Sequence, residues 1–172
     1  NIRIKASLRK YTPPKQNVAI KRALSVDSIR SIMNLNVEEH TRAELAKDCF
    51  IISFCLMGMN AVDLYGITQY DGNQITYNRT KTRERRSDQA LMIIDVPDII
   101  KPILRKYTTN NKDGHAFNFS SRYTKYEDFN RALNIGLKDI AKRIGLDNIQ
   151  FYSARHSMAT IAANDVRIPI YI

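Results

Sequence analysis

The sequence predicts a mainly α-helical domain with a small antiparallel β-sheet, which is the α+β class. Two observations support this prediction. Apolar residues recur at helical spacing over most of the chain, and between about residues 67 and 96 they alternate as in strands. The 172 residues are enough for one core, and no repeat or low-complexity segment divides them. We therefore expect a single domain over residues 1–172, with an extended arm at 1–23 and the core at 24–172.

The beginning of the chain is expected to be irregular. Residues 1–23 show no clear period, and the two prolines at positions 13 and 14 interrupt any helix there. Ser25 is a favourable N-cap, so a short helix is predicted from this serine to about Met33.

The next predicted helix begins between residues 36 and 41 and ends at Gly58. It contains the apolar run from Cys49, which places it at the centre of the core. Cys49 and Cys55 lie among apolar neighbours, a setting typical of buried thiols and not of a disulfide framework or a metal site. We therefore expect a reduced, cytoplasmic protein. The run is also too short to cross a membrane, which takes about 20 residues.

A change of period marks the predicted sheet. The Asp-Gly pair within residues 70–73 favours a tight hairpin turn, and residues 75–79 alternate in polarity after it. Residues 90–94 form a second strand-like run. The basic loop RTKTRERRSD, residues 79–88, separates the two runs, and we expect no apolar side chain to anchor it.

The rest of the chain returns to helical spacing. One helix is expected from Pro97 to about Tyr107, and a longer one over residues 129–144, where apolar residues follow i, i+3, i+4 spacing and Gly145 is a natural C-terminal stop. The stretch FYSARHSMAT, residues 151–160, opens the last helix.

The charge of the chain indicates an acidic partner. It carries 27 Lys and Arg against 17 Asp and Glu, a formal charge of +10. Eight basic residues and one acidic residue fall within residues 1–30, and five basic residues and one acidic residue within residues 79–86. Such a balance favours nucleic acid, and we expect double-stranded DNA. The candidates for DNA contact are Lys21, Arg22, Arg79, Arg83, Arg85 and Arg86.

Arg155 and His156 lie where the last helix begins, and two interpretations compete. In one, Ser153 caps an ordinary helix and Arg155 is solvated. In the other, the first helical turn and the guanidinium form an anion site, since a planar arginine suits a phosphate group.

Three segments, in order, resemble the conserved boxes of tyrosine recombinases, the phage integrase family. Residues 154–160, ARHSMAT, match the R-H-[ST]-x-A-T box, and Phe151-Tyr152 before them is similar to the form in members from Bacteroides. Residues 58–64, GMNAVDL, resemble the G-L-R-x-x-E-L box. Residues 77–82, YNRTKT, resemble the strand and loop that present the catalytic lysine. The resemblance implies a catalytic-domain-like fold.

The resemblance also implies a chemistry and a set of roles. Family members cleave a DNA strand through a 3′-phosphotyrosyl intermediate and rejoin it without metal or other cofactor, working as a tetramer on DNA. Arg155 would bind a non-bridging phosphate oxygen, and Lys81 would protonate the leaving 5′-oxygen. Asp63 and His156 would orient their neighbours. We expect Asn60, Arg155 and His156 to share one concavity, with Lys81 nearby.

The sequence departs from the family pattern in its first box and in its last. Asn60 stands where the family has an arginine, so either another basic residue replaces that charge, with Arg22 and Arg42 as candidates, or catalysis is weaker. Tyr152 stands where the family has a histidine; it can bind phosphate, but it is a poor base near neutral pH.

The third departure concerns the nucleophile. The chain ends seventeen residues after Arg155, so the Gly-His box and the nucleophilic tyrosine are expected outside it. Tyr171 comes too early in the sequence to be that nucleophile, and its apolar neighbours favour core packing. By itself this chain is expected to be inactive in cleavage, as a catalytic domain without its C-terminal part.

Two other classes of function stay open. A non-catalytic DNA-binding relative, acting as a regulator or structural partner, would explain Asn60 and Tyr152 as decay of a former site. The sequence that follows Ile172 in the gene discriminates between this class and the enzyme. An RNA-binding domain is disfavoured, because the chain has no aromatic RNP-like strand and no Gly-x-x-Gly loop.

Overall fold

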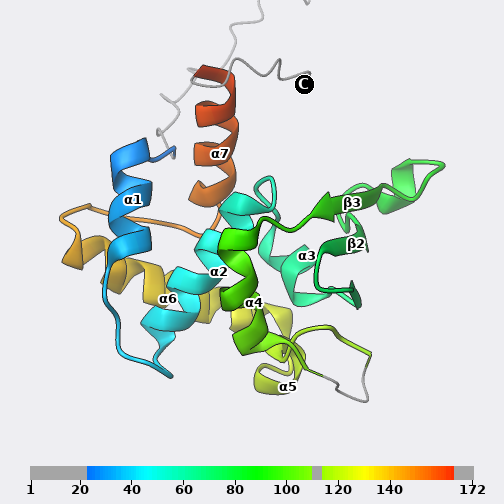
Figure 1. Cartoon of the computed structure of the whole chain (residues 1–172), viewed down its shortest axis with the longest axis horizontal. Coiled ribbons are helices and arrows are strands. Elements are labelled where there is room, and N and C mark those ends of the chain that lie inside the picture. Colours follow the sequence, from blue (N-terminus) through cyan, green and yellow to red (C-terminus); the bar gives the residue numbers. More distant parts are fainter. Residues whose placement is uncertain (1–22, 110–113, 165–172) are drawn as a thin grey trace, which may run out of the picture.

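A central helix, α2, is surrounded by the other helices, and a three-stranded sheet lies at one side (Figure 1). The computed structural model describes residues 23–109 and 114–164, so almost all of the predicted arm at 1–23 lies outside the described residues. The helices are α1 (Val26–Asn34), α2 (Arg42–Cys55), α3 (Ala61–Tyr65), α4 (Lys101–Tyr107), α5 (Phe119–Arg122), α6 (Tyr126–Arg143) and α7 (Ser153–Asn164). The strands are β1 (Gln69–Tyr70), β2 (Gln74–Asn78) and β3 (Leu91–Asp95), with 3-10 turns η2 (Arg83–Arg85) and η3 (Asp98–Ile100). This arrangement confirms the predicted α+β class.

The first two helices begin at side-chain caps. Ser25 accepts the Ser28 N–H at the start of α1, as predicted. At the start of α2, Thr41 Oγ1 accepts the Glu44 N–H at 3.2 Å, and the Glu44 carboxylate accepts the His40 N–H at 2.8 Å. The first bond satisfies one of the N–H groups that the start of α2 leaves unpaired, and the second ties the residue before the cap to the first turn of the helix.

Helix α2 packs against α6 and α7, and its side chains form the middle of the core. Gly136 of α6 allows the close approach, because a Cβ at this position would lie 2.5 Å from Ala46 Cβ and would also meet the Arg42 carbonyl oxygen. Cys49 is buried and Cys55 is partly buried, and both are free thiols. No described helix is long and apolar enough to cross a membrane.

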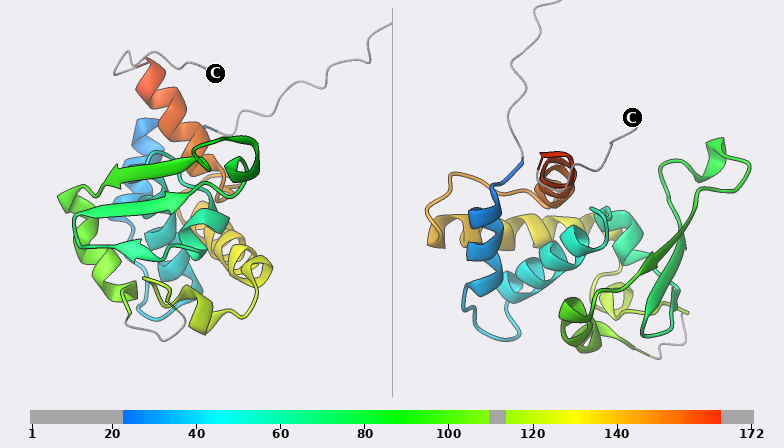
Figure 2. Two further views of the ribbon diagram at one scale, coloured as in Figure 1. Left: turned by 90° about the vertical axis from the view of Figure 1, so that its right-hand side faces the viewer. Right: turned by 45° about the horizontal axis from the view of Figure 1, so that its top comes forward.

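The sheet has the order β1-β2-β3 and is antiparallel throughout, with Thr76 opposite Gln69 on one side and Ile93 on the other. The β1–β2 turn forms as predicted. Asp71 accepts the N–H groups of the two residues after Gly72, which lower the pKa of its carboxyl group, and Gly72 has a φ of +97°. The long β2–β3 hairpin projects from the helical body (Figure 2).

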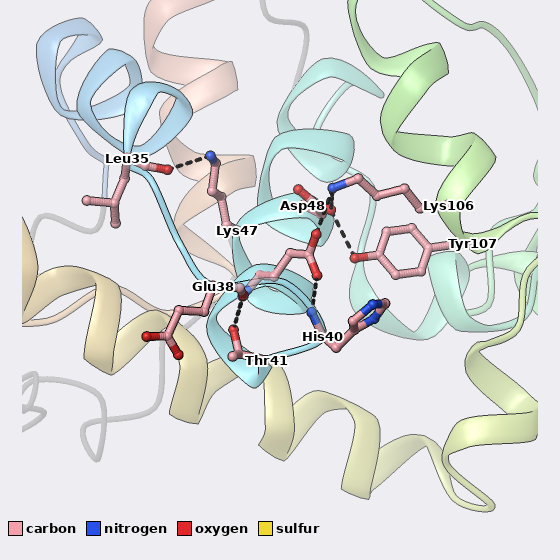
Figure 3. Close-up of polar contacts among 9 residues, drawn as sticks. Leu35, Glu38, His40, Thr41, Lys47, Asp48, Lys106 and Tyr107 are labelled. Atoms are coloured by element: carbon pink, nitrogen blue, oxygen red, sulfur yellow. Dashed lines mark hydrogen bonds and ion pairs between the residues drawn. The ribbon is translucent and has the colours of Figure 1, made fainter.

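A buried carboxylate fastens α4 to α2 (Figure 3). Asp48, in α2, accepts hydrogen bonds from Tyr107 Oη and Lys106 Nζ, each at 3.0 Å, and Lys106 also contacts Glu44 at 2.8 Å. Burial raises the pKa of the Tyr107 hydroxyl, and the charge of Asp48 adds to the shift. The cluster holds Tyr107 neutral and in place as a donor.

Several boundaries differ from the sequence prediction. Helix α2 ends at Cys55, not at Gly58, and the two residues Met57 and Gly58 reverse the chain with φ of 58° and 70°. The short helices α3 and α5 were not expected. The helix after Pro97 opens with the 3-10 turn η3, and α6 starts three residues before the expected 129.

Candidate functional site

A pocket of about 470 Å³ is formed where four separate parts of the chain meet. Its walls are residues 59–62 at the start of α3, Lys81 of the β2–β3 loop, one face of α6, and residues 150–152 together with Arg155 of α7. Three of the segments that resemble recombinase boxes therefore line one concavity.

The turn after α2 forms one edge of this pocket. The N–H groups of Gly58 and Met59 donate to the Ser53 carbonyl at 2.8 and 3.2 Å, and Ser53 Oγ donates to the Met59 carbonyl at 2.6 Å. The reversal brings Asn60 to the N-cap of α3, where its side chain forms no capping hydrogen bond. The Asn60 amide is thus not used in holding the helix.

Arg155 is held directly against this turn. Its Nη1 donates to the Gly58 carbonyl at 3.0 Å, and a Cβ on Gly58 would lie 2.8 Å from the Arg155 Cα. The side chain is half-buried and forms no ion pair with any carboxylate in the described part of the chain. Arg155 is therefore tied to a distant segment of the chain and only partly exposed to solvent. Its remaining N–H groups are available to a ligand.

Helix α7, which carries Arg155, is tied to the rest of the domain at its first turn. The Phe151 N–H donates to Asn134 Oδ1 of α6 at 3.0 Å, just before the helix begins at Ser153. Ser157 Oγ donates to the Ser153 carbonyl at 2.7 Å and accepts the Leu24 N–H at 2.8 Å. The bonds to Asn134 and Leu24 join the first turns of α7 to two other parts of the chain, and so help to position the arginine.

The β2–β3 loop is anchored next to Lys81. Buried Asp63 accepts the N–H of Thr80 at 2.9 Å through its carboxylate, and the Arg79 N–H donates to the Ala90 carbonyl at 3.0 Å. The anchor is thus a buried carboxylate, where the sequence had indicated only the lack of an apolar anchor. Lys81 itself is exposed and lines the pocket.

The pocket favours an anion. Among the described residues that line it, two are cations and none is a carboxylate; the others include four amides and two phenols. A larger hollow at the other end of α2 differs, because it contains Glu39 and Glu44 beside Lys106 and Arg122. Two cations in a pocket that no described carboxylate lines, surrounded by neutral hydrogen-bond donors, form an arrangement suited to phosphate.

Two aromatic residues next to Arg155 behave differently from each other. Tyr152 lines the pocket and has 43% of its surface exposed. His156 does not line it; its ring packs edge-on against Tyr152, with 4.7 Å between ring centroids. The expectation that His156 shares the concavity is therefore wrong, and its described contact is with Tyr152.

The other predicted DNA-contacting residues that the structure describes lie on the β2–β3 loop, and none of them lines the pocket. Arg83 lines a neighbouring pocket beside the sheet, and Arg85 is exposed. Arg86 is engaged by Asp88 through two hydrogen bonds of 2.8 and 2.6 Å. Arg79 is half-buried, and its Nε is buried without a hydrogen-bond partner in the described structure.

Of the two candidates to replace the missing arginine, only Arg42 is among the described residues, and it does not reach the site. Arg42 is the first residue of α2 and does not line the pocket, which adjoins the other end of that helix. Lys21 and Arg22 lie outside the described residues, as does Tyr171.

The sequence prediction missed the polar face of α6. Tyr126, Asn130 and Asn134 line the pocket at intervals of four residues, and Gln150 adds a further amide. A four-residue interval places side chains on one helical face, so this spacing, beside the apolar stripe of the same helix, was the signal that could have identified them.

Comparison of the chain with protein-family models, with curated proteins and with solved structures finds no match. Within the described residues, no group of three or more His, Cys, Asp or Glu side chains could hold a metal ion.

Proposed function

We propose that the chain is the DNA-binding and phosphate-binding part of a tyrosine recombinase catalytic domain, which cleaves and rejoins DNA strands. The observation that carries this proposal is the pocket itself. It gathers Arg155, Lys81, Asn60 and Tyr152 from distant parts of the sequence and contains no described carboxylate. A phosphodiester supplies the negative charge that these side chains lack.

The proposed chemistry uses two cations in different ways. A tyrosine hydroxyl oxygen attacks phosphorus and its proton passes to solvent, the bond from phosphorus to the 5′-oxygen breaks, and the 3′-phosphate remains on the tyrosine. Arg155, held by Gly58, stabilises the charge that develops on the non-bridging oxygens. Lys81 transfers a proton to the 5′-oxygen as it leaves.

In this proposal the attacking tyrosine belongs to residues that follow Ile172 in the gene. The active assembly is a tetramer on double-stranded DNA, as the family resemblance implies, and it acts in the cytoplasm, as the two free cysteines indicate. Asp63 serves the reaction indirectly, since its bond to the Thr80 N–H positions the backbone beside Lys81.

A second candidate is a DNA-binding relative without catalytic activity. The observation in its favour is that Asn60 presents a neutral amide and Tyr152 a phenol, where the resembling family has charged or basic groups. Both candidates use the same pocket to hold phosphate, so binding alone does not separate them.

DNA binding is tested first, with the chain and a mixed-sequence duplex. We expect affinity to fall steeply with salt, and Arg155→Ala to reduce the slope by about one counterion. The matched control is Arg131→Ala, because Arg131 is an exposed arginine of α6 paired with Asp128 and does not line the pocket. A flat salt dependence would contradict a phosphate-binding face.

Cleavage is tested with the complete gene product. Arg155→Ala should lower the cleavage rate by about 100- to 1000-fold. Lys81→Ala should also slow cleavage, and a substrate with a 5′-bridging sulfur should rescue it, because the better leaving group needs no proton. The sulfur substrate should not rescue Arg155→Ala. Normal DNA binding with no covalent complex on either substrate would favour the non-catalytic relative.

A further inference from the structure

The α6 wall of the pocket contains two amides that are linked in a fixed order. Asn130 and Asn134 lie one helical turn apart, and both line the pocket. The Asn134 side chain bridges from the loop before α7, where it meets the Phe151 N–H, to Asn130.

The backbone determines which way both amides face. The Phe151 N–H can only donate, so the atom it meets at 3.0 Å must be the Asn134 oxygen. Asn134 Nδ2 is then the donor to Asn130, whose carbonyl oxygen lies at 2.8 Å and whose Oδ1 lies at 3.2 Å. Because Asn130 Oδ1 accepts this bond, the other end of the Asn130 amide is its NH₂ group, Nδ2. No described residue accepts a hydrogen bond from Asn130 Nδ2.

We propose that Asn130 Nδ2 is a phosphate-binding donor, which acts beside Asn60 where the resembling family has a guanidinium. The ligand must supply a hydrogen-bond acceptor, and the pocket has two cations and no described carboxylate to favour a negatively charged one. An anionic oxygen of a DNA phosphodiester meets both requirements. This inference rests on the proposed function, and it adds a binding residue that neither composition nor family resemblance indicates.

The substitution Asn130→Asp separates binding from structure. It keeps the Oδ1 acceptor that Asn134 uses, and it replaces only the free NH₂ with a second, negatively charged oxygen. Asn130→Ala is the complementary change, since the Asn130 carbonyl still accepts the Asn134 bond at 2.8 Å. A matched charge control is Ile135→Asp, which adds the same charge to an exposed position of α6 outside the pocket.

The measurement is a titration of the ¹⁵N-labelled chain with inorganic phosphate and with a mixed-sequence DNA duplex, followed by side-chain amide NMR signals. We expect the Asn130 NH₂ signals to shift more than those of Asn134. Asn130→Ala should weaken binding by roughly 3- to 10-fold, as for loss of one hydrogen bond. Asn130→Asp should weaken it by more than about 10-fold, since an added carboxylate repels the anion, and Ile135→Asp should do so by less than about 3-fold.

Arg155→Ala keeps this test distinct from that of the proposed function. If Arg155→Ala weakens binding while both Asn130 variants bind like wild type, the pocket holds phosphate and the assignment of Asn130 is wrong. If wild type binds neither probe, or Arg155→Ala has no effect, the proposed function itself fails. Equal weakening by Asn130→Asp and Ile135→Asp would also overturn the inference, because it would reflect net charge alone.

Discussion

Gly58, in the segment 58–64, packs directly against Arg155, in the segment 154–160. Replacement of Gly58 by alanine tests this contact. A Cβ at Gly58 would lie 2.8 Å from Arg155 Cα and 2.9 Å from Arg155 Cγ. One of these atoms belongs to the backbone of α7, so a rotamer change cannot relieve the contact and the helix must move. Gly58 also has a φ of +70°, which alanine adopts only with strain.

The expected cost has two parts. The left-handed conformation costs an alanine about 1–2 kcal/mol, and the smaller entropy of the unfolded chain returns about 0.4–1 kcal/mol. Overpacking adds about 1–3 kcal/mol. We therefore expect Gly58→Ala to lower the free energy of unfolding by about 1–4.5 kcal/mol.

Gly145→Ala isolates the first part. Gly145 has a φ of +72°, almost equal to that of Gly58, but a Cβ there would meet nothing within 4 Å. Its cost should be about 1 kcal/mol, the backbone contribution alone. The difference between the two variants thus measures the contact with Arg155.

The assay is urea unfolding followed by circular dichroism, with phosphate titration as a second measurement. Gly58→Ala should also weaken phosphate binding, because it displaces Arg155, whereas Gly145→Ala should not. If the two variants differ in stability by less than about 0.5 kcal/mol, the usual effect of a substitution without structural conflict, the packing argument is refuted.

Three further predictions concern carboxylates. Asp48→Ala should lower the free energy of unfolding by about 3 kcal/mol in urea, since it leaves the buried Tyr107 hydroxyl without its acceptor and removes a carboxylate paired with Lys106, and Asp48→Asn should cost less. The pKa of Glu44 is lowered, because hydrogen bonds from Lys106 and the His40 N–H outweigh its burial, which acts the other way. The ionised Glu44 therefore stabilises the folded protein above the ordinary pKa of 4.5, and this stabilisation is lost as the pH falls through the lowered pKa. In a pH series of urea unfolding, Glu44→Gln should make the free energy of unfolding less sensitive to acid. Asp63→Ala should increase trypsin cleavage in the β2–β3 loop by about tenfold, through loss of the bond to the Thr80 N–H, whereas Asp63→Asn, which keeps an acceptor, should increase it less.

The elements that the sequence predicted well are those whose cause is local. Ser25 caps its own helix, the Asp71-Gly72 turn is made by bonds within four residues, and Gly145 ends α6 by its own conformation. Each depends on a few neighbouring residues, so the sequence pattern contains the information.

The end of α2 could not be predicted in this way. The apolar run continues past Cys55 without a break, and the chain reverses at Met57 because Ser53 binds the backbone of Met59 and Gly58 packs on α7. The second of these causes involves residues far along the chain. Helices α3 and α5 have five and four residues, too few for a period to be recognised.

The family resemblance indicated Asn60, Lys81, Tyr152 and Arg155, and the structure places all four on one pocket. It could not indicate Asn130, because the role proposed for this residue depends on the direction of a hydrogen bond from the Phe151 N–H. That direction is a property of the folded chain.

The number of cations in the pocket explains why neutral hydrogen-bond donors suit positions 60 and 130 in the proposed reaction. A phosphodiester carries one negative charge, and the pentavalent species formed by an attacking oxygen carries up to two. Lys81 and Arg155 supply two positive charges to the pocket. In the proposed reaction they match the transition state better than the substrate, which is the condition for lowering a barrier. A third cation would bind the substrate phosphodiester more tightly as well as the transition state. Neutral amides position the phosphate oxygens, and the two cations alone then respond to the extra negative charge of the transition state.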